Sequence, residues 1–175
     1  MKLFNLLAKL LDYPDEELMK HLGEITEQVN KLPDISEQET ASIQEFISWM
    51  DEHKTIAMQE IYVNTFDITP ENDLHLTHHL FGDDNRDRGP ALIDLSEHYK
   101  QAGLEVKKGE LPDYLPLMLE YLSSLSDIEV RIFLGDVMKI LKVLAENLEK
   151  AKSPYALLIR IVENRGYLAK AAEGE

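Results

Sequence analysis

Three histidines lie close together in the chain and are the side chains best suited to bind a metal ion. They are His75, His78 and His79, with Asp83 and Asp84 just beyond them. On a helix these three imidazoles would face roughly the same side, which is the arrangement that a metal site needs. No glutamate lies between His75 and His79, however, so the H-E-x-x-H pattern of zinc proteases is absent. We therefore favour a partly exposed helix face that carries histidines, and we predict no metal site.

The residue patterns of other catalytic sites are missing as well. The chain has no cysteine, which excludes disulfides, thiolate metal sites and thiol nucleophiles. It contains neither of the glycine-rich phosphate loops nor the G-x-S-x-G elbow of serine hydrolases. Carboxylates are plentiful, but in so acidic a sequence they pair by chance. We predict that the protein is not an enzyme and that it has no catalytic residues.

The run from Glu110 to Tyr121 is the most unusual stretch of the chain. It has two prolines four residues apart, Pro112 and Pro116, followed by a dense apolar segment. Pro112 suits the first position of a helix, whereas Pro116 would distort the first turns. Two acids accompany two tyrosines here: Asp113 and Glu120, Tyr114 and Tyr121. Two interpretations stay open, a helix start with core leucines or an acidic and aromatic recognition surface.

Composition and charge narrow the class of partner. The chain has 175 residues, 44% of them hydrophobic, which predicts one compact domain over 1–175 with a real core. Its net charge of −15 argues against binding nucleic acid or an anionic membrane surface. Residues 1–80 hold 16 acids and 5 bases (net −11), and residues 81–175 hold 17 acids and 13 bases (net −4). The concentrated acidity of the first half suits a cationic partner.

The N-terminus resembles a signal peptide only briefly. Its apolar start is interrupted by Lys9 and Asp12, and no cleavage site with small residues follows. No apolar run approaches the ~18–20 residues that a membrane-spanning helix requires. We expect a first amphipathic helix over 3–11 and a cytoplasmic protein that does not insert into a membrane.

Helical periodicity extends over almost the whole chain and predicts an all-α bundle of about eight or nine helices. Two S-x-x-E capping boxes, Ser36–Glu39 and Ser126–Glu129, mark helix starts, and Gly103 marks a helix end. The polar segment 82–89 is expected to be a surface loop. The expected helices are 3–11, 15–29, 36–50, 57–66, 70–80, 90–102, 112–123, 126–148 and 154–162.

Four motifs, taken together, resemble the NarJ family of respiratory nitrate reductase assembly chaperones, often called the delta subunit. They are Tyr62–Asp67, Arg86–Gly89, Ala102–Leu104 and the run from Glu110 to Tyr121. The resemblance covers the chain from about Leu6 to Leu168, and it extends to the wider TorD/DmsD-like chaperones of redox enzymes. It implies a TorD-like helical chaperone that binds the N-terminal segment of the apo catalytic (alpha) subunit. Such a chaperone assists insertion of the molybdenum cofactor, delays membrane attachment of its client, and binds no cofactor stably itself.

The resemblance also assigns site residues. The aromatic-x-x-x-Phe element of the wider group matches Tyr62 and Phe66, and its Glu-x-Pro-Asp-His element matches the segment from Glu110 to Tyr114. Tyr114 stands where the group usually has His, so this position keeps a hydrogen-bonding aromatic ring but supplies no imidazole.

The client segment would then lie as an amphipathic helix in an apolar groove with an acidic rim. The expected peptide-binding residues are Tyr62, Phe66, Asp67, Pro112, Asp113, Tyr114 and Glu120. Of these, Tyr62, Phe66 and Tyr114 would provide the buried anchors, and the three acids would meet basic side chains. Arg86 and Arg88 would orient their loop or contact an acidic patch on the client or its cofactor, or else pair with Asp83, Asp84 and Asp87. The alternative is a helical adaptor that binds another basic amphipathic peptide and has no role in cofactor loading.

Overall fold

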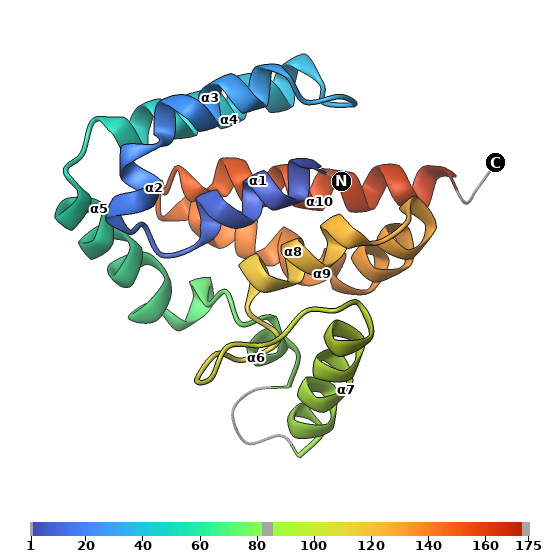
Figure 1. The fold of residues 1–175 in the computed structure, drawn as a ribbon. Helices are drawn as coiled ribbons and strands as arrows, with labels where there is room; N and C mark the ends of the chain where they lie inside the picture. Colours follow the sequence, from blue (N-terminus) through green and yellow to red (C-terminus); the bar gives the residue numbers. More distant parts are fainter. Residues whose placement is uncertain (1, 82–85, 173–175) are drawn as a thin grey trace.

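The computed structural model describes residues 2–81 and 86–172, and over these ranges the chain forms ten α-helices and no β-strand (Figure 1). The all-α prediction is therefore confirmed. Eight of the helices have eight or more residues, and the remaining two, α2 and α6, have five and six. The helices are α1 (Lys2–Leu11), α2 (Glu16–Lys20), α3 (Leu22–Asn30), α4 (Glu37–Asp51), α5 (Thr55–Tyr62), α6 (Leu76–Phe81), α7 (Arg88–Gln101), α8 (Leu115–Ser124), α9 (Asp127–Lys150) and α10 (Tyr155–Ala172).

The core is built on two helix pairs. The long helices α9 and α10 pack as a hairpin, and α1 packs along α8 in front of them (Figure 1). All five leucines of α1 are buried, which is what their helical spacing predicts. Helices α3 and α4 pack against each other, and α4 also packs against α10. Helices α6 and α7 lie at the opposite end of the molecule. Full burial of one leucine of α1 stabilises the fold by about 1.5–3 kcal/mol.

Local capping signals set three helix ends as predicted. Both capping boxes form, with Ser36 and Ser126 each exchanging hydrogen bonds with the glutamate three residues on. Gly103 has a φ of 77° and follows the C-cap of α7. The amide of Leu104 donates to the carbonyl of Tyr99 at 2.8 Å, which completes a Schellman motif that only a residue tolerant of positive φ allows.

Three predicted helices have different bounds in the structure. The predicted helix 15–29 is two helices, α2 and α3, that meet at His21. The predicted helix 70–80 is a 3₁₀ turn over Pro70–Asn72, an extended stretch, and then α6. The predicted start at Pro112 is wrong, because α8 begins at Leu115 and the proline in its first turn is Pro116. There Pro116 removes no intrahelical hydrogen bond, since the first amides of a helix have no partner within it.

Other boundaries differ less. Of the predicted surface loop 82–89, residues 82–85 lie outside the described residues, and α7 already begins at Arg88.

None of the helices over the described residues combines the length and the apolar character needed to cross a lipid bilayer.

Candidate functional site

Two extended segments, distant in sequence, meet at the site. His75 and Tyr114 form an isolated antiparallel bridge. On either side of it, the amide of Leu115 donates to the carbonyl of Leu74 at 2.9 Å and the amide of Leu76 donates to the carbonyl of Asp113 at 3.1 Å. These bonds fix the start of α6 against the start of α8, and they bring the motif around Tyr114 to the residues that precede α6.

A pocket of about 290 Å³ opens beside this junction. We call it the tyrosine pocket. Its walls contain four carboxylates, one imidazole and no lysine or arginine among the described residues. The lining residues are Asp12, Tyr13, Tyr62, Phe66, Asp67, Asp73, Leu74, His75, Gly109, Glu110 and Tyr114.

The aromatic wall of the pocket comes from an irregular helix end. After α5, residues Val63–Asp67 form a π-turn, closed by the amide of Ile68 donating to the carbonyl of Val63 at 3.0 Å. The rings of Tyr62 and Phe66 then lie 4.8 Å apart, and that of Tyr155 lies 4.8 Å from Phe66. Both Tyr62 and Phe66 are buried, so the pocket floor is continuous with the hydrophobic core.

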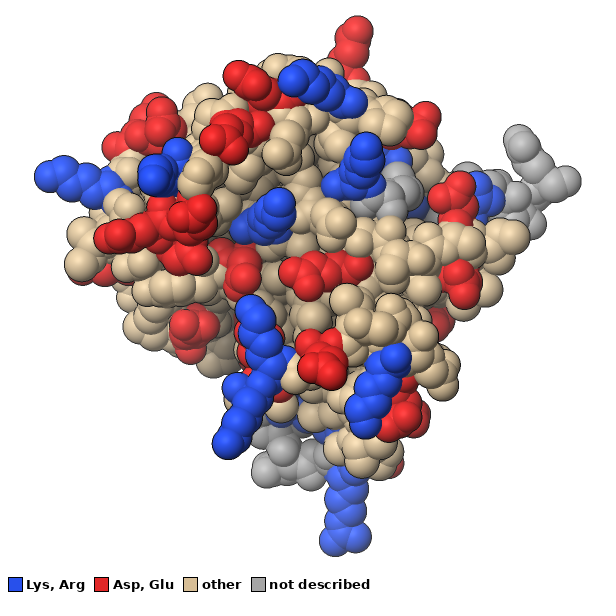
Figure 2. All heavy atoms as spheres, viewed as in Figure 1, with Lys and Arg blue, Asp and Glu red and all other residues tan. Residues whose placement is uncertain are grey.

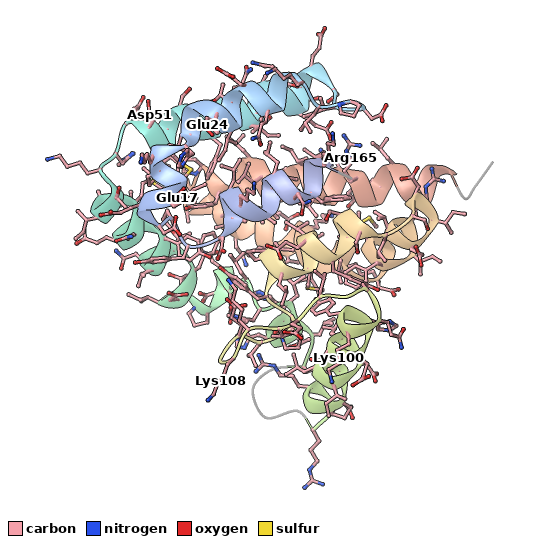
Figure 3. The ribbon with its side chains drawn as sticks, viewed as in Figure 1. Glu17, Glu24, Asp51, Lys100, Lys108 and Arg165 are labelled. Atoms are coloured by element: carbon pink, nitrogen blue, oxygen red, sulfur yellow. The ribbon has the colours of Figure 1, made fainter. Side chains whose placement is uncertain are left out.

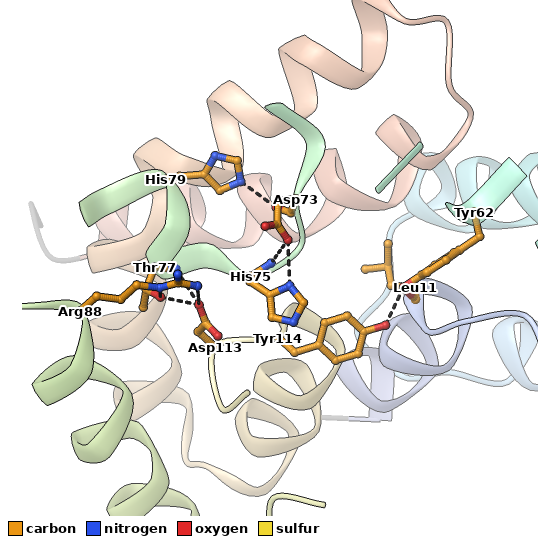
Figure 4. Close-up of polar contacts among 9 residues, drawn as sticks. All are labelled: Leu11, Tyr62, Asp73, His75, Thr77, His79, Arg88, Asp113 and Tyr114. Carbon is orange, nitrogen blue, oxygen red and sulfur yellow. Dashed lines mark hydrogen bonds and ion pairs between the residues drawn. The ribbon is translucent and has the colours of Figure 1, made fainter. Parts of the chain in front are cut away.

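The two tyrosine hydroxyls of the pocket lie at the end of α1, and Figure 4 shows Tyr62 and Tyr114 beside Leu11. The Tyr62 hydroxyl lies 3.0 Å from the carbonyl of Leu11, and that of Tyr114 lies 3.0 Å from Oδ1 of Asp12. The hydroxyl oxygens of Tyr62 and Tyr114 lie 2.5 Å apart. Burial, together with the nearby Asp12 carboxylate, raises the pKa of both tyrosines well above its ordinary value, so both hydroxyls remain neutral donors.

The hydrogen-bonded side chains of Asp73 and His75 form another wall of the pocket. Nδ1 of His75 lies 2.8 Å from Oδ1 of Asp73, which also accepts from the His75 amide at 2.9 Å. The hydrogen bond to Asp73 raises the pKa of His75. Burial alone would raise the pKa of Asp73, but its hydrogen bonds from His75 outweigh burial and lower it. The imidazole stacks on the Tyr114 ring at a centroid distance of 5.3 Å, so an imidazole does border the pocket, although it comes from another segment.

The histidine cluster is not arranged as the helical spacing suggested. His75 precedes α6, and Nε2 of His79 lies 2.6 Å from the backbone carbonyl of Asp73. Among the described residues, no group of three or more histidine or carboxylate side chains is arranged to hold a metal ion.

Asp113 lies beneath the pocket and does not line it. Its side chain is fully buried, and its Oδ2 accepts from the amide of Thr77 at 3.0 Å and from the Thr77 hydroxyl at 2.5 Å (Figure 4). Arg88 donates from Nε to the same hydroxyl at 3.0 Å, and its Nη2 lies 3.9 Å from Oδ2 of Asp113. Through these contacts the buried carboxylate joins α6, α7 and the start of α8.

The remaining predicted residues are dispersed around the site. Pro112 is buried and its carbonyl accepts from the Tyr99 hydroxyl at 2.5 Å, so it lies behind the pocket. Asp67 is exposed at the pocket rim. Glu120 is exposed on α8, and partial burial together with the negative charge of Asp12 raises its pKa. Arg86 is exposed beside the first turn of α7.

Seven residues of the pocket lining lie outside the predicted set: Asp12, Tyr13, Asp73, Leu74, His75, Gly109 and Glu110. The pair Asp73-x-His75 has the short spacing of an Asx-type turn, and this local signal could have identified it. Asp12 and Tyr13 have no such signal, because only the packing of α1 against α8 brings them to a motif about a hundred residues away.

Comparison with known proteins identifies the family. Residues 30–158 match the family model described as nitrate reductase delta subunit. The chain is 33% identical over 157 residues to the nitrate reductase molybdenum cofactor assembly chaperone NarJ of Escherichia coli strain K12, covering 90% of this chain and 66% of that protein. It is 31% identical over 159 residues to the probable assembly chaperone NarJ of Bacillus subtilis strain 168, covering 91% and 85%.

A third relative is the nitrate reductase-like protein NarX of Mycobacterium tuberculosis, which is 30% identical over 105 residues, 60% of this chain and 16% of that protein. The chain thus spans slightly less than two thirds of the length of the E. coli relative, and most of the B. subtilis one. The family match covers the pocket residues from Tyr62 to Tyr114. The chain belongs to the nitrate reductase delta subunit family.

Proposed function

We propose that the protein is a maturation chaperone of respiratory nitrate reductase. The observation that carries this proposal is its similarity, over about nine tenths of the chain, to proteins named as nitrate reductase molybdenum cofactor assembly chaperones. In this role the protein acts in the cytoplasm and is not an enzyme. It prepares the client for molybdenum cofactor insertion and binds no cofactor stably itself.

The client contact is the N-terminal segment of the apo catalytic (alpha) subunit, bound at the tyrosine pocket. Such a segment, with basic and apolar side chains, forms an amphipathic helix that lies in a groove. An apolar side chain of the helix would fill the space between Phe66 and Tyr114. Burying one leucine-sized side chain supplies about 1.5–3 kcal/mol.

The pocket rim sets the charge of the ligand. Asp12, Asp67 and Glu110 line the pocket, and its described lining residues include no lysine or arginine, so the rim favours a cationic segment and disfavours an acidic one. While it occupies the pocket, the segment is unavailable for other contacts. This would delay membrane attachment of the client until the cofactor has been inserted.

The proposal is tested by isothermal titration calorimetry with a peptide of the first ~15–20 residues of the nitrate reductase catalytic subunit from the same organism, a length sufficient for a short helix. A scrambled peptide of equal composition is the control for charge alone. We expect saturable binding of the native peptide that exceeds binding of the scrambled one. No binding at low salt, or equal binding of both peptides, would contradict the proposal.

A further inference from the structure

A second concave surface adjoins the tyrosine pocket and has no assigned role. It is a groove of about 400 Å³ formed by the end of α1, the short helix α2 and the first turns of α3. Its apolar floor is contributed by Leu18, which is half-buried, and Ile25, which is buried. Four carboxylates, those of Asp12, Asp15, Glu17 and Glu24, border it together with one lysine, Lys9, and one imidazole, that of His21. We call this surface the acidic groove.

The acidic groove and the tyrosine pocket are continuous. Asp12 and Tyr13 line both of them. The ring of Tyr13 packs edge-on against that of Tyr62 with centroids 5.7 Å apart, so one aromatic side chain forms the partition between the two. A single helical segment that crosses Tyr13 would therefore contact both concavities.

The charges around the groove are available to a ligand. The side chains of Glu17 and Glu24 are 78% and 72% exposed, and the two residues lie on α2 and α3 (Figure 3). In the groove lining, the His21 ring lies 3.3 Å from Glu17 and 3.9 Å from Glu24. Figure 2 shows acidic side chains gathered around α2, at the left of the view, whereas the end of the molecule that carries α7 presents more lysine and arginine.

We propose that the acidic groove binds a lysine or arginine side chain of the same client segment whose apolar anchor occupies the tyrosine pocket. This proposal rests on the proposed function and adds a second subsite to it. The apolar floor receives the methylene stem of the basic residue, and the carboxylates of Glu17 and Glu24 pair with its charged end. The occupant is fixed by charge complementarity and by continuity with the pocket, because a basic amphipathic helix is the ligand that satisfies both surfaces at once.

The test compares two double variants with the same change in net charge on the same two helices. Glu17→Gln with Glu24→Gln removes charge from the groove. Glu16→Gln with Glu27→Gln removes the same charge from exposed positions outside it. Binding of the ~20-residue client peptide is measured by calorimetry at low salt. We expect the groove variant to weaken binding about three- to tenfold and the control variant by less than about twofold, since exposed ion pairs contribute modestly.

A peptide with its basic residues replaced one at a time by glutamine completes a double-mutant cycle. We expect one basic position of the peptide at which the effects of the peptide change and of the groove variant on the binding free energy are not additive. The proposal of a second subsite would be overturned if the two double variants weakened peptide binding equally. It would also be overturned if the effects on binding were additive at every basic position of the peptide. In that case binding by the parent protein, and its sensitivity to changes in the tyrosine pocket, would still support the proposed function. A parent protein that fails to bind the peptide at all would overturn both proposals.

Discussion

The hydroxyl oxygen of Tyr62 lies 2.5 Å from that of Tyr114, although the two tyrosines are 52 residues apart in the chain. The two hydroxyls carry one proton each and have three contacts within hydrogen-bond distance, to the Leu11 carbonyl, to Oδ1 of Asp12 and to each other, so two of the three can be hydrogen bonds at one time. This arrangement links α5, the start of α8 and the end of α1 through one polar cluster. The aromatic residues of the proposed binding site are therefore positioned by the first helix of the chain.

Removing the Tyr62 hydroxyl should cost more stability than removing that of Tyr114. Tyr62→Phe leaves the carbonyl of the buried Leu11 without this donor, so we expect a loss of about 1–3 kcal/mol. Both variants lose the contact between the two hydroxyls, and besides it Tyr114→Phe loses a contact to the exposed Asp12, for which we expect about 0.5–1.5 kcal/mol. Urea unfolding at one pH measures both losses of stability, and the reverse order would contradict the larger contribution that we assign to the Leu11 contact.

The Asp73–His75 pair should make stability depend on pH. The folded pKa of His75 is raised, so its contribution is complete below the unfolded value of about 6.5 and is lost as pH rises through the folded pKa. The folded pKa of Asp73 is lowered, so its contribution is present above about pH 4 and is lost as pH falls through the folded pKa. The pair should therefore stabilise the fold most between about pH 4 and pH 6.5.

His75→Asn, which keeps an N–H donor but cannot become charged, tests this dependence. We expect the difference in unfolding free energy between the parent protein and the variant to decrease from pH 6 to pH 8.5. The change should stay below about 1 kcal/mol, because the pair is partly exposed to solvent. A constant difference over this range would show that His75 does not gain a proton preferentially in the folded state.

Asp113→Asn should lower stability and leave the salt dependence of peptide binding unchanged. The Asp113 carboxylate is buried and accepts two hydrogen bonds from Thr77, so neutralising it weakens charge-assisted bonds that no solvent replaces. We expect a loss of about 1–3 kcal/mol in thermal or urea unfolding. A variant of parental stability that binds peptide with a flatter salt dependence would instead place this carboxylate in contact with the ligand.

Arg165 should anchor α10 to the start of α4. Its guanidinium donates from Nε and Nη2 to the two carboxylate oxygens of Glu39, each at 2.7 Å (Figure 3 labels Arg165). Burial alone would raise the pKa of Glu39, but hydrogen bonds from Arg165 and from the Ser36 backbone outweigh burial and lower it. We expect Arg165→Met to cost about 1–3 kcal/mol near neutral pH, with Arg165→Lys recovering part of this because it keeps the charge and loses the bidentate geometry.

The stability conferred by the Arg165–Glu39 pair should also be lost in acid. Because the folded pKa of Glu39 is lowered, its contribution is present above the unfolded value of about 4.3 and disappears as pH falls through the folded pKa. The unfolding curves of the parent protein and Arg165→Met should therefore converge at low pH. Curves that remain equally far apart would show that the arginine stabilises the fold through packing alone.

The parts of the fold that follow from neighbouring residues could be predicted from the sequence. The capping boxes at Ser36 and Ser126 and the glycine at 103 each act within one helix turn, so their effects can be read locally. The stretch before α6 could not be predicted in this way. Its helical pattern is overridden by the backbone bridge between His75 and Tyr114, which depends on tertiary structure.

The candidate site shows the same division. Tyr62, Phe66, Asp67 and Tyr114 were predicted, and the structure brings them to one pocket. Residue type alone did not distinguish an acid that borders this pocket from one beneath it. Asp67 is exposed at the rim, whereas Asp113 is fully buried, because the partners that enclose Asp113 come from α6 and α7.

Asp67 provides the most direct test of the acidic rim. It is exposed at the pocket opening, so Asp67→Asn should leave unfolding unchanged while it weakens binding of the client peptide about two- to fivefold at low salt. The effect should largely vanish at about 0.5 M salt, where exposed charges are screened over a few ångströms. Glu60→Gln is the matched control, because Glu60 is exposed on the neighbouring helix α5 but does not line the pocket. Equal effects of the two substitutions would mean that net charge, rather than a contact at the rim, attracts the peptide. A loss of binding that persists at high salt would mean that Asp67 supports the pocket structurally.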